Sequence, residues 1–487
     1  MTSDRLLAEL QALRTAVARE GMAVLNGWRP WVERDEFAES AADLACYLAL
    51  RHRDLRGLQE NLMAVGLSSL GRAEGRVLAT LDVTLASLAA VAGASPLPRP
   101  DAEAFFRGER LLSAATDQLF GASPAPRQVR ILVTCPSESA ADPIFFTRLA
   151  EAGADAVRIN CAHDDEATWR AMIAGARSAE AATGRRLRVL MDLAGPKIRT
   201  GTVRHPPGRK RLLVGDRLLL CRSGLVDGAD APKFQAICTL PDLFAFLAPG
   251  HRMCFDDGKL GGTIERLDPA GALVVIRHAG PEGARLKPDK GLNFPDSALV
   301  VPALTEKDRA DLKVVASFVD LVGYSFVQTP ADIEELQAAL AEAAPDRWRE
   351  LGLVAKIETP TAVRNLPQLV VRGAGRQPLA LMIARGDLAV EIGFERLAEM
   401  QEEILWLAEA AHVPVIWATQ VLETLVKQGL PSRGEMTDAA MAARAECVML
   451  NEGPFVLEAV RALDRLLTRM AEHQYKKAPK LRALKSW

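Results

Sequence analysis

The stretch LALMIARGD, residues 379–387, places six apolar residues directly before two charged residues that flank a glycine. A continuous apolar run of this length is typical of a strand buried on both faces, as in a parallel sheet covered by helices. Burying an unpaired charge is costly, so charges directly after such a strand need partners or a ligand. The stretch therefore predicts a buried strand that ends at a functional edge of its sheet.

The same arrangement recurs along the chain from residue 129. Most of the apolar runs are followed by a stretch with helical periodicity, such as 330–343, 395–411 and 455–473. The other predicted strands are 129–134, 156–160, 187–192, 320–326, 353–358, 413–419 and 447–450. Eight strands that alternate with helices predict an α/β protein whose centre is a (β/α)8 barrel of the TIM type.

The remaining segments suggest additions to this barrel, as expected for a chain of 487 residues. Residues 1–125 repeat apolar residues at helical spacing and predict an N-terminal α-helical extension for packing or oligomerisation. Residues 202–290 are rich in Gly, Pro and short β-like runs, so we expect an inserted β-rich lid domain there. The barrel then comprises residues 126–201 and 291–475, and residues 476–487 are predicted to be a solvated basic tail.

The composition is typical of a globular protein, with 49% hydrophobic and 25% charged residues. A net charge of −2 argues against nucleic acid or an anionic membrane as the main partner. The seven cysteines follow no metal-ligand spacing, which suits a reducing cytoplasm. The most apolar window, residues 77–93, contains Asp82 and predicts a buried helix, not a membrane span. We expect a soluble cytoplasmic protein.

Polar side chains follow the predicted strands at the end where a barrel of this type places its active site. They are Arg158, Asn160, Asp192, Lys197, Arg199, Ser325, Lys356, Glu358, Arg385, Asp387 and Thr419. Glu358 and Asp387 follow adjacent strands, so their carboxylates could bind one hard cation such as Mg²⁺. The cations around them, Arg385 included, suit phosphate or carboxylate groups. The set therefore predicts phosphoryl transfer or enolate stabilisation.

Several motifs at these strand ends resemble those of the pyruvate kinase family. They are VRINCAH (157–163), MDLAGPKIRTG (191–201), KGLNFP (290–295), AKIET (355–359), MIARGDLAVEI (382–392), VIWATQVLETL (415–425) and PSRGEMTDAA (431–440). The resemblance covers roughly residues 129–468 and implies phosphoryl transfer from phosphoenolpyruvate to ADP, giving pyruvate and ATP. It also implies Mg²⁺ or Mn²⁺ as cofactor and a homo-oligomeric assembly.

Carried over position by position, the resemblance implies a role for each candidate residue. Glu358 and Asp387 match the ligands of the divalent metal. The catalytic residues would be Lys356, Arg158 and Thr419; the substrate would bind at Ala384, Arg385, Gly386 and Ser325; the nucleotide side would comprise Asn160, His163, Arg199 and Lys290. Lys356 would neutralise the transferring phosphoryl group and the enolate oxygen, and Thr419 would lie on the face where the enolate carbon is protonated.

One departure from the family pattern concerns a monovalent cation. The family usually has a glutamate at the position of Lys197 and K⁺ ligands with hydroxyl groups at the positions of Ala162 and Leu193. Here those hydroxyls are missing and an ammonium group has appeared. Because a tethered ammonium supplies one positive charge, we expect Lys197 to replace K⁺ near Asp192, so that K⁺ is not required.

Two further departures follow the eighth predicted strand. The stretch LNEGPFVLEAV (450–460) lacks the hydroxyls with which the family relays a proton, and Asn451 or Glu452 would have to replace them. We also expect the family's C-terminal regulatory domain, and with it effector control through that domain, to be absent. Two alternatives stay open at this point. One is a non-catalytic or regulatory protein on the same barrel, and the other is a metal-dependent lyase or decarboxylase acting on phosphoenolpyruvate or pyruvate.

Overall fold

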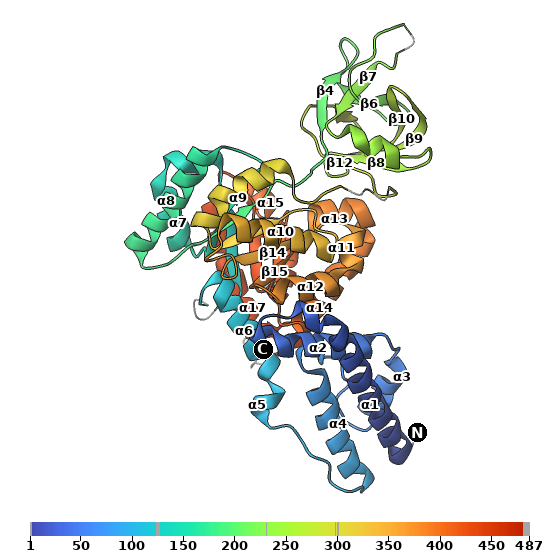
Figure 1. Ribbon diagram of the computed structural model, residues 1–487, viewed down its shortest axis with the longest axis vertical. Coiled ribbons are helices and arrows are strands. Elements are labelled where there is room, and N and C mark those ends of the chain that lie inside the picture. Colours follow the sequence, from blue (N-terminus) through green and yellow to red (C-terminus); the bar gives the residue numbers. More distant parts are fainter. Residues whose placement is uncertain (1, 123–126, 230, 298, 300, 481–487) are drawn as a thin grey trace.

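The computed structural model describes residues 2–122, 127–229, 231–297, 299 and 301–480, and its centre is a closed barrel of parallel strands (Figure 1). The strands, in the order in which they neighbour one another, are β1 (Arg130–Thr134), β17 (Cys447–Leu450), β16 (Val415–Ala418), β15 (Leu379–Ala384), β14 (Gly352–Ile357), β13 (Leu321–Tyr324), β3 (Arg188–Asp192) and β2 (Ala156–Asn160). The predicted (β/α)8 fold is thus confirmed.

Helices cover the outside of the barrel (Figure 1). They are α7 (Pro143–Ala152), α8 (Glu166–Thr183), α9 (Glu306–Phe318), α10 (Pro330–Ala343), α11 (Pro360–Arg364), α12 (Leu366–Ala374), α13 (Arg385–Ile392), α14 (Phe394–Ala410), α15 (Glu423–Gln428), α16 (Arg433–Met441) and α17 (Val456–His473). Reciprocal capping boxes begin α9, α10 and α16, so the first turns of these helices have their backbone donors satisfied. The barrel interior is filled by apolar side chains such as Leu132, Leu190, Val354 and Ile416.

The insertion after β3 forms a separate β domain, called the lid from here on, with its own apolar core at one end of the barrel (Figure 1). Its main sheet consists of β12 (Leu292–Asn293), β8 (Arg252–Phe255), β9 (Leu260–Asp268), β10 (Gly271–Ala279), β6 (Arg217–Cys221), β7 (Phe234–Cys238) and β4 (Thr200–Arg204), in that order. Two short strands, β5 (Arg211–Leu212) and β11 (Ala284–Arg285), pair beside it.

The N-terminal extension is helical, as predicted, and packs against the end of the barrel opposite the lid (Figure 1). Its helices are α1 (Ser3–Trp28), α2 (Asp35–Arg51), α3 (Arg56–Ala64), α4 (Val77–Ala92), α5 (Ala102–Phe105) and α6 (Arg107–Phe120). Leu119 and Phe120, at the end of α6, are buried in the same apolar cluster as the barrel interior. The extension therefore closes the base of the barrel with its own side chains.

In the described part of the chain, one helical segment, Glu74–Ala92, is both long enough and apolar enough to cross a membrane, judged by length and composition alone. In this structure it packs within the extension, where α4 contacts α1 and α2. Val77, Leu81, Leu85 and Leu88 are buried there. The helix thus forms part of the core of the extension.

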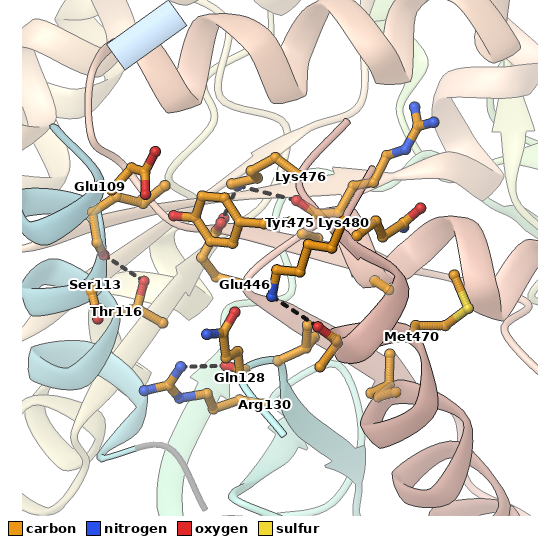
Figure 2. Close-up of a pocket in the computed structure, with 18 of the residues that line it drawn as sticks. Glu109, Ser113, Thr116, Gln128, Arg130, Glu446, Met470, Tyr475, Lys476 and Lys480 are labelled. Atoms are coloured by element: carbon orange, nitrogen blue, oxygen red, sulfur yellow. Dashed lines mark hydrogen bonds and ion pairs between the residues drawn. The ribbon is translucent and has the colours of Figure 1, made fainter. Parts of the chain in front are cut away.

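The start of the predicted basic tail is not solvated, which corrects the prediction for this stretch. Lys476 is buried and its Nζ pairs with the carboxylate of Glu446, while Lys477 Nζ pairs with Glu74 of the extension. Figure 2 shows Lys476 and Glu446 at a cavity of about 540 Å³ that α6, α17 and the base of the barrel enclose. Two charged residues of the tail are therefore held by carboxylates, and residues 481–487 lie outside the described part.

A close backbone contact joins the extension to the barrel helices. The carbonyl oxygen of Gly375, at the end of α12, accepts hydrogen bonds from the backbone N–H groups of Glu33 and Arg34, each at 2.9 Å. A Cβ atom at Gly375 would lie 2.2 Å from the carbonyl oxygen of Trp31. This contact leaves no room for any side chain at position 375.

We therefore expect Gly375→Ala to lower the free energy of unfolding by about 1–3 kcal/mol, because the backbone must shift to accept the methyl group. Thermal denaturation measures the effect. The matched control is Gly434→Ala in α16, where a Cβ meets nothing within 4 Å and the melting temperature should stay the same or rise. Equal melting temperatures for the two variants would contradict the close contact at Trp31.

Candidate active site

A buried cluster of two cations and two carboxylates lies at the carboxyl ends of β2, β3 and β14. Arg158 donates to Asp192 Oδ2 from Nε at 2.8 Å and from Nη2 at 2.6 Å. Lys356 Nζ lies 3.3 Å from Asp192 Oδ2 and 3.2 Å from Glu358 Oε1. The side chains of Asp192 and Glu358 are only 1% and 2% exposed. One carboxylate, Asp192, therefore holds two cations that come from different strands.

The charges of this cluster depend on one another. Burial opposes the charged form of Asp192, but Lys356 and Arg158 outweigh it and hold the pKa of Asp192 below its usual range. Burial likewise disfavours the Lys356 ammonium, yet Asp192 and Glu358 raise the pKa of Lys356 above its ordinary value. Lys356 therefore stays protonated at neutral pH in a place with little water.

Ser325 links Lys356 to the loop after β3. Its Oγ accepts a hydrogen bond from Lys356 Nζ at 2.8 Å and donates one to the carbonyl oxygen of Leu193, also at 2.8 Å. The two segments approach closely because Gly195 has a φ of +65° and its Cβ would lie 2.8 Å from Ser325 Cβ. A glycine is thus needed at this corner of the loop.

Thr419 stands on a strained turn after β16. Its φ is +65°, and Gln420 and Leu422 have φ values of +57° and +49°, which non-glycine residues rarely adopt. Thr419 Oγ1 accepts a hydrogen bond from the backbone N–H of Gly386 at 2.8 Å. The hydroxyl is thereby aimed at the turn that follows β15.

Arg385 maintains this turn through its own contacts. Its Nη1 and Nη2 donate to the two carboxylate oxygens of Asp438 at 2.5 and 2.8 Å, and Nη2 and Nε donate to the carbonyl oxygens of Thr419 and Ala418 at 2.7 and 2.9 Å. From the sequence, the Arg385 guanidinium is predicted to be one of the cations available for anionic groups. The structure corrects this, because Asp438 and two carbonyls occupy its donors.

Glu358 and Asp387 are the carboxylates predicted to bind a divalent metal, and their environment fits such an ion. Burial raises the pKa of Glu358, and the negative charge of Asp387 adds to this effect although Lys356 opposes it. A cation between the two carboxylates would relieve their repulsion. No three His, Cys, Asp or Glu side chains among the described residues form a ready-made metal site, so further ligands would have to come from substrate or water.

Lys197 pairs with Asp387 and not with the cluster around Asp192. Its Nζ lies 3.0 and 3.2 Å from the two carboxylate oxygens of Asp387, and both side chains are partly buried. The tethered-cation hypothesis placed this ammonium near Asp192. The ammonium instead reaches the second predicted metal ligand, which follows β15 and is separated from β3 by β14 and β13 around the barrel.

The residues predicted for the nucleotide side lie in two places. Asn160 is the last residue of β2 and His163 lies in the loop that follows, where Asn160 Oδ1 accepts from the backbone N–H of Ala162 at 3.2 Å. Arg199 and Lys290 belong to the lid, and their acidic partners there are Asp289 at 3.4 Å and Asp256 at 3.0 Å. In this structure the two pairs are thus held by separate domains.

Comparison with known proteins agrees with this arrangement. Residues 126–457 match the family described as pyruvate kinase, barrel domain. A pyruvate kinase of Mycobacterium intracellulare is 33% identical over 349 residues, which cover 70% of each chain. A pyruvate kinase of Methylorubrum extorquens is 32% identical and covers 70% of this chain and 68% of its own. Pyruvate kinase 2 of a Synechocystis species is 31% identical over 72% of this chain and 58% of its own.

The chain belongs to the pyruvate kinase family. It is therefore a phosphotransferase, and the general reaction of the family is phosphoryl transfer that converts phosphoenolpyruvate to pyruvate. The alternative of a non-catalytic protein on the same barrel is set aside by this result. The roles of individual residues do not follow from family membership and are proposed below.

The structure adds one residue that sequence reasoning did not single out, Asp438. Asp438 lies within the quoted motif PSRGEMTDAA, but nothing in the sequence indicated that it pairs with Arg385, 53 positions away. Burial raises the pKa of Glu452, and Arg158 and His163 are among the charges that oppose this rise. Its neighbour Asn451 donates to Glu423 at 3.0 Å.

Replacing Asp438 should misplace the turn that carries Thr419. We expect Asp438→Asn to lower kcat for pyruvate formation by about tenfold or more, because small displacements of positioned groups have large kinetic effects. Asp438→Glu should restore part of the loss by restoring the charge. The matched control is Asp346→Asn at an exposed position. Unchanged kcat in Asp438→Asn would show that Arg385 does not need this carboxylate.

Proposed function

We propose that this chain transfers the phosphoryl group of phosphoenolpyruvate to ADP, with Glu358 and Asp387 holding a divalent cation such as Mg²⁺ or Mn²⁺. The observation that supports this most directly is the protonated Lys356 between two buried carboxylates, Asp192 and Glu358. An ammonium in a site with little water stabilises the negative charge that develops in phosphoryl transfer better than a solvated one does.

The balance of charge at the strand ends supports a requirement for the metal. Three cations, Arg158, Lys197 and Lys356, pair with the three carboxylates Asp192, Glu358 and Asp387. Without a further cation the site has no excess positive charge for an anionic substrate. A divalent ion on Glu358 and Asp387 supplies that charge and polarises the oxygens of the substrate.

The proposed roles of the other residues follow from their positions. Arg158 lies beside Lys356 on Asp192, so we assign it to the phosphoryl group. The turn at Ala384, Arg385 and Gly386 is assigned to the substrate carboxylate, with Ser325 orienting Lys356. Thr419 is assigned to the proton-transfer side of the substrate. Asn160, His163, Arg199 and Lys290 are assigned to the nucleotide, which would require the lid to approach the barrel.

We further propose that the enzyme does not require K⁺. Asp192, which would be a ligand of the ion, already carries Arg158 and Lys356, and Ala162 and Leu193 offer no hydroxyl. Lys197 adds one more ammonium at the same end of the barrel. Its contact with Asp387 would have to yield or rearrange when a divalent metal binds, which frees the ammonium for the substrate. A cytoplasmic location and a homo-oligomeric assembly stay predictions.

The phosphotransfer assignment is tested by pyruvate formation from phosphoenolpyruvate and ADP with Mg²⁺. We expect Lys356→Met and Glu358→Gln each to lower kcat by at least about a hundredfold, because each removes a charge that contacts the reacting groups. Lys313→Met, at an exposed position of α9, is the control and should retain full activity. Oxaloacetate decarboxylation without turnover of phosphoenolpyruvate would instead support the lyase or decarboxylase alternative.

The role of Lys197 is tested by the same assay with and without K⁺. Wild type should be active without K⁺, and Lys197→Glu should become K⁺-dependent or inactive, because the substitution removes one positive charge and adds a negative one beside Asp387. Lys313→Glu controls for the change in net charge. A wild type that needs K⁺ would refute the proposal for Lys197 and leave the phosphotransfer assignment in place.

A further inference from the structure

The lid contains a cavity of about 610 Å³ whose lining is strongly cationic. Its charged residues are Arg211, Lys259, Arg285, Lys287 and Lys290, with Asp256 as the one carboxylate in the lining. Lys259 and Lys290 both pair with Asp256, at 3.1 and 3.0 Å. Five cations against one carboxylate leave four positive charges without a counterpart in the cavity wall.

A second cavity of the same lid, of about 490 Å³, shows that this imbalance is not general for the domain. There Arg209 pairs with Asp216 at 2.8 Å and Arg217 pairs with Glu265 at 2.9 Å. In the first cavity, by contrast, Arg211, Arg285 and Lys287 form no ion pair with any residue in the described part of the chain. The lid thus pairs most of the cations at the second cavity with carboxylates, whereas at the first cavity three of the five cations have no acidic partner among the described residues.

The backbone holds two of these unpaired cations directly opposite each other. Arg211 of β5 and Arg285 of β11 are register partners in an antiparallel pair. Like charges at such positions repel each other and destabilise the pairing. The pair is enforced by the turn at Gly283, which has a φ of +73° and whose Cβ would lie 2.5 Å from the carbonyl oxygen of Leu212. Arg211 Nη1 also donates to the carbonyl oxygen of Gly283 at 2.9 Å.

We propose that this cavity, formed around Arg211, Arg285 and Lys287, binds the phosphate chain of a polyanion. Phosphate oxygens accept charge-assisted hydrogen bonds from several cations at once, and a chain of phosphate groups can bridge the opposed arginines and remove their repulsion. A ligand with a single carboxylate would neutralise only one of the four excess positive charges of the cavity. Arg211, Arg285 and Lys287 are exposed, so binding depends on ionic strength.

The phosphate chain can come from a nucleotide or from a free inorganic polyphosphate. Lys290 lines the cavity and was assigned above to the nucleotide side, so the cavity extends that side into the lid. The backbones of Lys287 and Lys290 lie close together in space. Their carbonyl oxygens both contact Thr200 Oγ1, at 2.8 and 3.5 Å respectively. Only the nucleotide source rests on the proposed function; the anion site itself does not.

The test is a calorimetric titration of the whole chain with inorganic tripolyphosphate, at low ionic strength and without divalent metal. We expect Arg285→Gln/Lys287→Gln to weaken binding by about tenfold or more, because two charge-assisted contacts are removed. The matched control is Lys233→Gln/Arg266→Gln, which removes two cations from the second lid cavity. Its dissociation constant should stay within about twofold of wild type, as expected for charges remote from the bound ion.

Competition by ADP then identifies the source of the phosphate chain. If ADP displaces tripolyphosphate, and Arg285→Gln/Lys287→Gln raises KM for ADP without raising KM for phosphoenolpyruvate, the cavity serves the nucleotide. If ADP does not compete, the cavity is a separate site for free polyphosphate. Either result supports the site.

Two results would overturn the proposal: no binding of tripolyphosphate by wild type, or equal weakening in the two double variants. Because the titration involves no turnover, these results leave the phosphotransfer assignment untouched. Conversely, a chain that binds tripolyphosphate in this cavity but forms no pyruvate would refute the assignment and keep the anion site.

Discussion

The rest of the site depends on the ion pairs that the buried carboxylate of Asp192 forms with Arg158 and Lys356. This carboxylate accepts two hydrogen bonds from Arg158 and lies 3.3 Å from Lys356 Nζ, while the Asp192 side chain is only 1% exposed. Three strands, β2, β3 and β14, are thereby joined by charge at the point where the barrel opens. Either cation alone would be costly to bury, and without them burial would raise the pKa of Asp192. The cluster is stable only as a whole, which explains why an ammonium can stay charged there.

Each lysine of the site forms an ion pair with a carboxylate, and a ligand can replace that partner. Lys197 pairs with Asp387, Lys290 pairs with Asp256, and Lys356 pairs with both Asp192 and Glu358. Under the proposed function, a divalent metal or an anionic substrate would change the partner of each cation without creating an unpaired charge in the barrel. The lid differs in this respect, because the opposed Arg211 and Arg285 have no acidic partner among the residues that the structure describes.

Much of the barrel was predictable because each strand is defined by its own residues. β15 matches the predicted run 379–384, and the amphipathic stretch 330–343 matches α10 at both ends. The side chains that follow the strands were predictable for a topological reason, since parallel strands bring all their carboxyl ends to one edge. Their partners were not. Lys197 and Asp387 are 190 positions apart, and the expected neighbour Asp192 is only five positions from Lys197.

The sequence by itself determined the order of elements, the edge of the barrel at which the polar residues gather, and the residue types offered there. Local periodicity and the burial of apolar runs carry that information, because both act over a few residues. Only the tertiary structure decided which charge meets which: Arg385 on Asp438, Lys197 on Asp387, and Lys476 buried on Glu446. The energy of an ion pair depends on a separation of a few ångströms and on burial, and both are set by how distant segments pack.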